Sequence, residues 1–285
     1  MKDERKVILI VTIGRTGSTL LQGILNTIPN ALITGENYGV FVNFWKAFED
    51  VNNISERTGE SKSKTTSPWF NPELSVDEFA ESLRKTAVSV IDPKEKHRVI
   101  GFKEIRYDDV PRDKLKEYIH FLQHVLFENA YVVFLTRDGK QVLKSMENVD
   151  WPHKCLEDIE DFFKLVHTLG GERRIVIDYS QITEDDKLSE LFEFVGEKYD
   201  RNLVSEVLKE RHSYVATNHM IGDYYYYGRG GREKDDKKAF EHWEKGANDG
   251  NTQCMRNLAW AYRDGIGCEV DKQKVAEWLD KAESR

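Results

Sequence analysis

Apolar residues along the chain fall into short unbroken runs that alternate with stretches of helical periodicity. The clearest run, Lys6–Thr12, is rich in β-branched residues and is followed by a glycine-containing loop and then by leucines and isoleucines at helical spacing. Three later runs have the same character: Arg98–Lys103, Tyr131–Leu135 and Arg174–Asp178. Such runs indicate strands buried on both faces of a sheet. Their alternation with helices predicts an α/β domain with a doubly wound parallel sheet.

From about Asn218 the pattern changes to charged helical stretches that repeat. The pair Gly228 and Gly230 recurs 37 residues later as Gly265 and Gly267. The same spacing relates three further pairs: Ile221 and Leu258, Tyr225 and Tyr262, and Ala239 and Ala276. A unit of this length is typical of helical solenoid repeats. We therefore predict two domains, residues 1–217 and residues 218–285, of which the second is a small all-α repeat module.

The segment Val51–Asn71 is polar and shows neither helical nor strand periodicity. We expect an irregular surface loop there. Two interpretations of this loop stay open, a lid over a substrate and a loop without function.

Composition narrows the class of protein. Hydrophobic residues make up 39% and charged residues 32% of the 285 positions, as in soluble globular proteins. The net charge of −8 argues against a broad nucleic-acid-binding surface but permits a local positive pocket for one anionic cofactor. The early apolar run is too short for a secretion signal or a membrane span. Three cysteines without metal-ligand spacing predict reduced thiols, no metal and a cytoplasmic location.

The loop after the first predicted strand carries the first candidate binding residues. It reads Gly-Arg-Thr-Gly-Ser-Thr over Gly14–Thr19. Glycines allow backbone N–H groups to converge on an anion at a helix N-terminus, where the helix dipole favours negative charge. Arg15 adds a positive charge, and Ser18 and Thr19 supply hydroxyl donors. A plain strand-to-helix connection is the alternative. The lysine of the GxxxxGK[ST] loop is missing, which disfavours Walker-type nucleotide hydrolysis.

A second signature lies where the strand Tyr131–Leu135 ends and a helix is expected to begin. Arg137 stands at the end of the strand and Ser145 follows eight residues later. A guanidinium can donate two N–H bonds to a phosphate dianion, and a serine two helical turns further on can face the same oxygens. A strand-end salt bridge and a buried small residue are the alternatives for the two positions.

Together the two segments resemble the sulfotransferases that use 3′-phosphoadenosine 5′-phosphosulfate (PAPS). The resemblance covers about Lys6–His212 and implies a P-loop-like sulfotransferase fold with no metal required. It implies PAPS binding by Arg15, Thr16, Gly17, Ser18, Thr19, Arg137 and Ser145. The glycine-rich segment near the end of cytosolic sulfotransferases has only a loose echo in Gly228–Arg232. We therefore expect the adenosine end to be held as in the bacterial and carbohydrate branch.

Two residues are candidates for the chemistry. Glu36 follows a short apolar stretch that could be a strand, and in the bacterial and carbohydrate branch a glutamate at this point resembles the general base. A bond from Glu36 to loop backbone is the alternative. Lys103 ends a predicted strand, where it or Arg106 can neutralise a leaving phosphate. Glu104 can pair with a cation or act as base, but alternation along the strand puts it on the opposite side from Lys103, which we prefer.

Five aromatic residues are candidates for an acceptor pocket, although core packing accounts for each of them equally well. They are Trp45, Phe48, Trp69, Phe70 and Trp151. The C-terminal segments resemble Sel-one-like repeats, relatives of the tetratricopeptide repeats. Because two repeats are few for independent stability, we expect them to dock on the catalytic domain. Binding a protein partner, completing the acceptor site and capping the fold all stay open as roles.

The sequence therefore favours an enzyme that moves the sulfuryl group of PAPS to a hydroxyl or amine of a small-molecule or carbohydrate acceptor. No nucleic-acid or membrane partner is expected. A nucleotide-dependent kinase is one alternative, although the Walker lysine is missing. A non-catalytic adaptor built on a sulfotransferase-like domain is the other.

Overall fold

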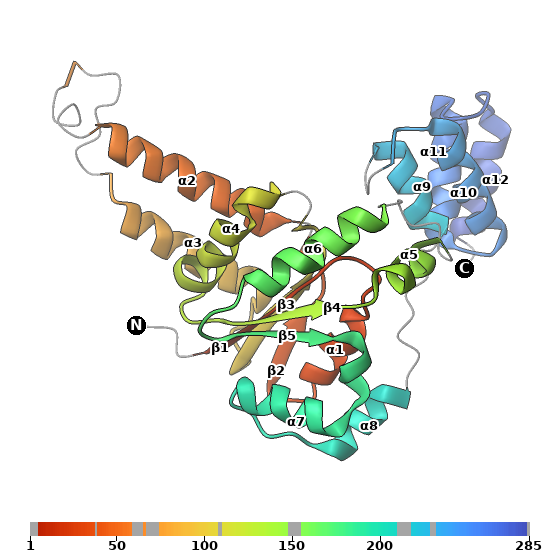
Figure 1. Cartoon of the computed structure of the whole chain (residues 1–285). Coiled ribbons are helices and arrows are strands. Elements are labelled where there is room, and N and C mark those ends of the chain that lie inside the picture. The colour runs from red at the N-terminus through yellow and green to blue at the C-terminus, as the bar shows by residue number, and fades with distance from the viewer. Residues whose placement is uncertain are drawn as a thin grey trace. The chain divides into compact units, whose positions relative to one another are not determined.

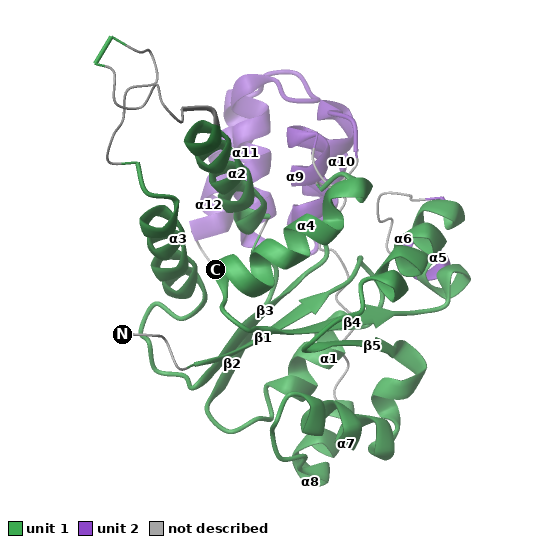
Figure 2. Ribbon diagram, turned by 60° about the vertical axis from the view of Figure 1, so that its left-hand side comes forward, with its two compact units in different colours: residues 1–142, 156–212 green, residues 143–155, 213–285 purple. Residues whose placement is uncertain are grey.

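A computed structural model describes residues 5–37, 39–58, 65–66, 74–107, 110–147, 155–209, 218–228 and 232–283. It contains two compact units, coloured separately in Figure 2. The first comprises Met1–Val142 and Leu156–His212, and the second Leu143–Cys155 and Ser213–Arg285. The domain boundary expected between residues 217 and 218 adjoins residues outside the described ranges and stays a prediction.

The first unit is built on a five-stranded parallel sheet. Its strands are β1 (Lys6–Val11), β2 (Ala31–Thr34), β3 (Val99–Glu104), β4 (Tyr131–Thr136) and β5 (Arg174–Asp178). They lie in the order β2-β3-β1-β4-β5, with every neighbouring pair parallel. The central strand is apolar because it is covered on both faces, and Ile8, Leu9 and Ile10 are fully buried. The predicted parallel α/β sheet is confirmed.

Helices cover both faces of the sheet, as a doubly wound fold requires (Figure 1). One face carries α1 (Ser18–Leu25), α7 (Asp185–Phe194) and α8 (Arg201–Lys209). These helices and the sheet share one apolar cluster, whose members include Ile8, Ile10, Leu21, Ile24, Leu188, Leu191 and Val204. This cluster holds the start of α1 against the end of β1.

The opposite face carries α3 (Val76–Ile91), α4 (Leu115–His120), which continues into a π-helical turn over Phe121–Leu126, and α6 (Leu156–Thr168). On α2 (Val40–Thr58), Phe41 packs its ring against Phe102 of β3, with ring centroids 4.8 Å apart. The irregular loop predicted from Val51 is therefore wrong for residues 51–58, which are helical. These residues are polar because the apolar contacts of α2 are made by residues nearer its start. The remainder of Val51–Asn71 lies largely outside the described ranges.

Four helices form the core of the second unit: α9 (Asn218–Tyr227), α10 (Asp236–Asn248), α11 (Thr252–Asp264) and α12 (Lys272–Glu283). They are the two predicted helix pairs, and Trp243 of α10 is fully buried between them. Ala239 is buried whereas its repeat partner Ala276 is exposed. Ala239 is buried because the second repeat packs on α10. Ala276 is exposed because α12 is the last helix among the described residues, so no further repeat covers it there.

Among the residues that the structure describes, no helix is both long enough and apolar enough to cross a membrane.

Candidate functional site

The candidate residues gather where the strands end. The three neighbouring strands β3, β1 and β4 are parallel, so the segments that follow them meet at one edge of the sheet. The contact that joins the two sequence signatures is direct: Nη1 of Arg137 donates to the carbonyl oxygen of Arg15, at 3.0 Å. These two segments are 122 positions apart in the sequence.

The loop after β1 is held in a tight conformation by its own groups. The hydroxyl of Thr12 donates to the carbonyl of Leu135 on β4, and that of buried Thr16 donates to the carbonyl of Ile13. Because the Thr16 hydroxyl is used in this way, Thr16 can contribute to an anion site through its backbone N–H. Ser18 is buried at the first position of α1, and Thr19 beside it is exposed. The N-terminus of α1 therefore opens at this loop.

Two features of the structure require glycine at position 17: its backbone conformation and the lack of room for a side chain. Its φ of 92° lies in the left-handed region, which glycine adopts without strain. A Cβ at this position would lie 2.2 Å from the ring of Tyr179. Tyr179 follows β5 and opens a 3₁₀ turn over Tyr179–Thr183 that the side chain of Asp178 caps. The loop after β1 and the turn after β5 are thus in close contact.

Arg137 is positioned by groups without a full negative charge. Besides its bond to the Arg15 carbonyl, its guanidinium lies 4.2 Å from the centre of the Tyr179 ring. It also donates to the amide oxygen of Gln141, at 3.4 Å. Burial, and then the charge of Arg137, lower the pKa of Arg15 below the ordinary arginine value. Two mutually repelling cations at a helix N-terminus form an environment that an anion would stabilise.

Ser145 lies on α5 (Gly139–Glu147), the helix that begins two residues after Arg137. It is partly buried, and its segment, Leu143–Cys155, groups with the second compact unit. Its place in a phosphate site stays a prediction.

Glu36 and Lys103 contact each other. The ammonium of Lys103 donates to Oε1 of Glu36 at 2.7 Å, and Nη1 of Arg106 lies 3.2 Å from Oε2. Lys103 is nearly buried at the end of β3, whereas Glu36 lies on the connection between β2 and α2. Two cations thus hold the Glu36 carboxylate, one at each oxygen. Loop backbone, the alternative expected for Glu36, is instead bound by Glu104.

Glu104 anchors two loops from the other side of β3. Its Oε2 accepts backbone N–H groups of Asn37 and Gly39, each at 3.2 Å, and its Oε1 accepts those of Ile105 and Arg106, at 2.8 and 3.0 Å. The residue is 3% exposed. The cation pairing expected for Glu104 is confirmed, since Nη1 of Arg106 lies 3.5 Å from its Oε1. Its bonds to backbone amides were not anticipated, because Asn37 and Gly39 belong to a loop that only the fold brings to β3.

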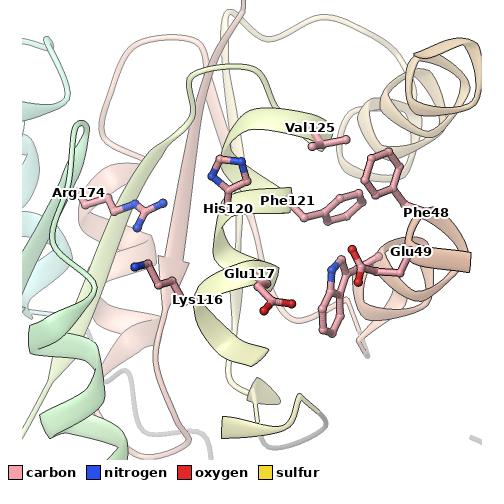
Figure 3. A pocket seen from close by; sticks show the side chains of 9 residues that line it. Phe48, Glu49, Lys116, Glu117, His120, Phe121, Val125 and Arg174 are labelled. Carbon is pink, nitrogen blue, oxygen red and sulfur yellow. The ribbon is translucent and has the colours of Figure 1, made fainter. Parts of the chain in front are cut away.

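Of the five aromatic residues predicted as candidates for an acceptor pocket, two are described by the structure. Trp45 and Phe48 line a cavity of about 420 Å³ beside α4, and their rings also pack on Tyr118 and Phe121. Figure 3 shows Lys116, His120 and Arg174 on one side of this cavity and Phe48 and Glu49 on the other. A smaller cavity, of about 360 Å³, is lined by Glu36 itself. Trp69, Phe70 and Trp151 lie outside the described residues.

Sequence reasoning missed Tyr179 and left Arg106 as an option. Arg106 had a signal, since a basic residue just past a buried strand end points to the ligand edge of a parallel sheet. Tyr179 had none, because a tyrosine after a strand has no distinctive chemistry until the turn places its ring against Gly17. Within the described ranges, no group of three or more His, Cys, Asp or Glu side chains is arranged to hold a metal ion.

Comparisons with known proteins agree with this description. The family model described as the sulfotransferase family matches residues 8–201, and the Sel1 repeat model matches residues 216–251 and 252–285. No curated protein matches significantly. Among solved structures, mouse sulfotransferase SULT7A1 complexed with PAP is 13% identical, with a TM-score of 0.36, and the match covers 72% of this chain and 64% of that one.

A Sel1 repeat protein from Oxalobacter formigenes is 16% identical, with a TM-score of 0.24, over 73% of this chain and 55% of that one. The chain thus spans less than two thirds of either solved relative. The family model, in contrast, covers well over half of this chain. The chain belongs to the sulfotransferase family and carries two Sel1 repeats after its sulfotransferase region.

Proposed function

We propose that this sulfotransferase takes its sulfuryl group from PAPS and transfers it to a hydroxyl or amine of a small-molecule or carbohydrate acceptor. The observation that carries the proposal is the placement of Arg137 on the Arg15 carbonyl and the Tyr179 ring, beside the loop that contains Gly17. This places two guanidinium-bearing residues at a helix N-terminus, an arrangement suited to the phosphates and sulfate of PAPS.

In this proposal each of the candidate residues has a separate role. The loop Arg15–Thr19 holds the 5′-phosphosulfate through backbone N–H groups and the hydroxyls of Ser18 and Thr19, and Arg137 with Ser145 holds the 3′-phosphate. Glu36 accepts the proton of the acceptor hydroxyl or amine as the new bond to sulfur forms. Lys103 neutralises the negative charge that develops on the leaving phosphate oxygen as its bond to sulfur breaks.

The ion pairs at Glu36 support its role as base. Lys103 contacts one carboxylate oxygen of Glu36 and Arg106 the other, so both oxygens are fixed in position beside the site. The same ion pair holds Lys103 beside the proposed base.

The two Sel1 repeats are proposed to bind a protein partner.

The first test is a calorimetric titration with 3′-phosphoadenosine 5′-phosphate (PAP), the product that remains after transfer, with ADP as control. We expect PAP to bind more tightly than ADP, and Arg137→Ala to weaken PAP binding by about a hundredfold because a charge-assisted pair of bonds is lost. Arg98→Ala, which removes an arginine at the other end of the sheet, is the matched control. Equal binding of ADP and PAP, or no binding, would favour a kinase or an adaptor.

The second test addresses the base. Glu36→Gln should lower kcat for PAP release from PAPS by about 10²- to 10⁴-fold, because the amide cannot accept the proton, while PAP affinity stays near that of the wild type. The measurement is coupled detection of PAP in the presence of 4-nitrophenol, cyclohexanol or methyl glucoside as acceptor. Unchanged turnover would assign the base to another residue.

A further inference from the structure

The connection between β2 and α2, which carries the proposed base, is bound to β3 on both sides of that residue. Before it, the hydroxyl of Thr34 donates to the carbonyl oxygen of Gly101 on β3, at 3.1 Å. After it, the backbone N–H groups of Asn37 and Gly39 both donate to Oε2 of Glu104, at 3.2 Å each. The end of β3 therefore sets where the backbone of the proposed base lies.

Glu104 holds its end of this connection through a buried negative charge. The residue is 3% exposed, and its Oε1 accepts two further N–H groups, from Ile105 at 2.8 Å and Arg106 at 3.0 Å. A buried carboxylate is costly unless donors surround it, and hydrogen bonds to a charged acceptor are stronger than those between neutral groups. If the connection moved away from β3, this carboxylate would lose two of its four backbone donors. The loop that carries the base is therefore held more firmly than a loop bound by neutral groups.

The guanidinium of Arg106 links Glu104 to the base a second time. Its Nη1 lies 3.2 Å from Oε2 of Glu36 and 3.5 Å from Oε1 of Glu104, so one cation lies between two carboxylates and offsets their repulsion. The other oxygen of Glu36 is bound by Lys103, the neighbour of Glu104 in β3, at 2.7 Å. Both the backbone and the carboxylate of Glu36 thus depend on groups that Glu104 holds or adjoins.

We propose that Glu104 is a positioning residue of this enzyme: it places the carboxylate of Glu36 for proton transfer and does not itself meet the substrate. Because it is 3% exposed and accepts four N–H bonds, Glu104 is not available to take the proton of an acceptor. This inference rests on the proposed function, since Glu104 acts only through the base. Displacing a reacting group by about 1 Å can cost about a hundredfold in rate, so the expected effect is on turnover.

Asp92 offers a matched control at the other end of the sheet. It is 1% exposed, and its Oδ2 accepts the backbone N–H of His97 at 2.9 Å, in the connection between α3 and β3. Asp92 and Glu104 are thus both buried carboxylates that bind loop amides, but only Glu104 binds the loop that carries the base. Loss of either carboxylate should destabilise the chain, whereas only loss of Glu104 should slow the reaction.

The first experiment measures PAP release from PAPS, with 4-nitrophenol, cyclohexanol or methyl glucoside as acceptor. Glu104→Gln should lower kcat about tenfold to hundredfold, with KM for PAPS and the affinity for PAP unchanged. Glu104→Asp keeps the charge and can still accept the amides of its own turn, but it is one methylene shorter, so it should release the loop and lower kcat as well. Asp92→Asn should leave kcat unchanged. Equal losses of kcat in Glu104→Gln and Asp92→Asn, or no loss in either Glu104 variant, would overturn the proposal.

A double-mutant cycle separates positioning from a general effect on the fold. If Glu104 acts through Glu36, adding Glu104→Gln to Glu36→Gln should change kcat by no more than about twofold, because the base is already gone. A general effect on the fold would instead multiply the two losses. Multiplied losses would assign Glu104 a structural role and overturn the proposal.

The bonds to the loop can be measured without turnover, by amide hydrogen exchange. In Glu104→Gln and Glu104→Asp the amides of Asn37 and Gly39 should exchange at least about tenfold faster than in the wild type, whereas Asp92→Asn should leave them unchanged. Unchanged exchange in both Glu104 variants would overturn the proposal, even for an enzyme that used none of the three acceptors. A wild type that bound no PAP, with exchange as expected, would instead overturn the proposed function, since the loop would then be held in place without a reaction to serve.

Discussion

Arg98 and Arg137 lie at opposite ends of the parallel sheet and are held by different kinds of group. At the amino ends of the strands, Arg98 donates to both carboxylate oxygens of Glu197, at 2.9 and 2.6 Å, and Lys6 binds the same carboxylate. At the carboxyl ends, Arg137 is held by a backbone carbonyl, an amide oxygen and an aromatic ring. Arg98 is held by a carboxylate, whereas Arg137 is held by groups that carry no charge.

The pKa shifts follow this difference. The bond to Glu197 raises the pKa of Arg98 above the ordinary arginine value. Burial and the neighbouring Arg137 lower the pKa of Arg15. The ion pair of Arg98 and Glu197 thus stabilises the folded chain, whereas Arg137, held by neutral groups, adds positive charge beside the N-terminus of α1. We therefore expect Arg98 to contribute to stability and Arg137 to anion binding.

The largest expected effect is at the carboxyl end. Gly17→Ala should lower the free energy of unfolding by about 2–4 kcal/mol. Alanine is strained in the left-handed backbone conformation of this position, and its Cβ would overlap the Tyr179 ring. It should also abolish PAP binding, since the loop must move away from Arg137. Urea denaturation and calorimetry measure the two effects.

Gly35→Ala is the matched control for this substitution. Gly35 lies beside Glu36, yet a Cβ there meets nothing within 4 Å. It should change stability and PAP affinity little. Equal effects of the two substitutions would show that the conformation of the first loop is not what makes the anion site.

These positions also show what the sequence could predict. The buried strands could be predicted because covered parallel strands need continuous β-branched residues. The turn from β1 into α1 could be predicted because glycines follow the apolar run and helical spacing begins after them. The contacts of Glu104 and Tyr179 could not, because their partners are loop amides and a glycine that become neighbours only after the sheet orders its strands. The helical end of α2 was missed because polar residues there carry no periodic signal.

A smaller effect is expected at the amino end. Glu197→Gln should lower the free energy of unfolding by about 1–2 kcal/mol, because the amide cannot accept both bonds of Arg98. PAP affinity should be unchanged. Glu206→Gln, which removes the exposed partner of Lys209, is the control and should have little effect. Loss of PAP binding in Glu197→Gln would show that the two ends are coupled.

The pH dependence of the same pair sharpens this result. The bond from Arg98, assisted by Lys6, lowers the pKa of Glu197 from 4.5, although burial opposes the shift. A carboxylate with a lowered pKa stabilises the folded state above its unfolded pKa, and this contribution is lost as the pH falls through the folded pKa. Wild type and Glu197→Gln should therefore approach each other in stability in acid. A difference that stays constant from pH 7 to pH 3 would assign the effect to packing.

The smallest effect tests the charge at the carboxyl end without a nucleotide. Sodium sulfate should stabilise the wild type by about 0.4 kcal/mol at a concentration equal to its Kd, because the anion binds only the folded site. Sulfate also stabilises proteins generally by exclusion from their surface, so the specific part is the difference between wild type and Arg137→Ala. Sulfate should stabilise Arg98→Ala by as much as it stabilises the wild type, because the guanidinium of Arg98 binds Glu197 and not the anion. If sulfate stabilised all three proteins equally in thermal melts, the charge held by Arg15 and Arg137 would not form an anion site, and the contrast between the two ends of the sheet would reduce to packing.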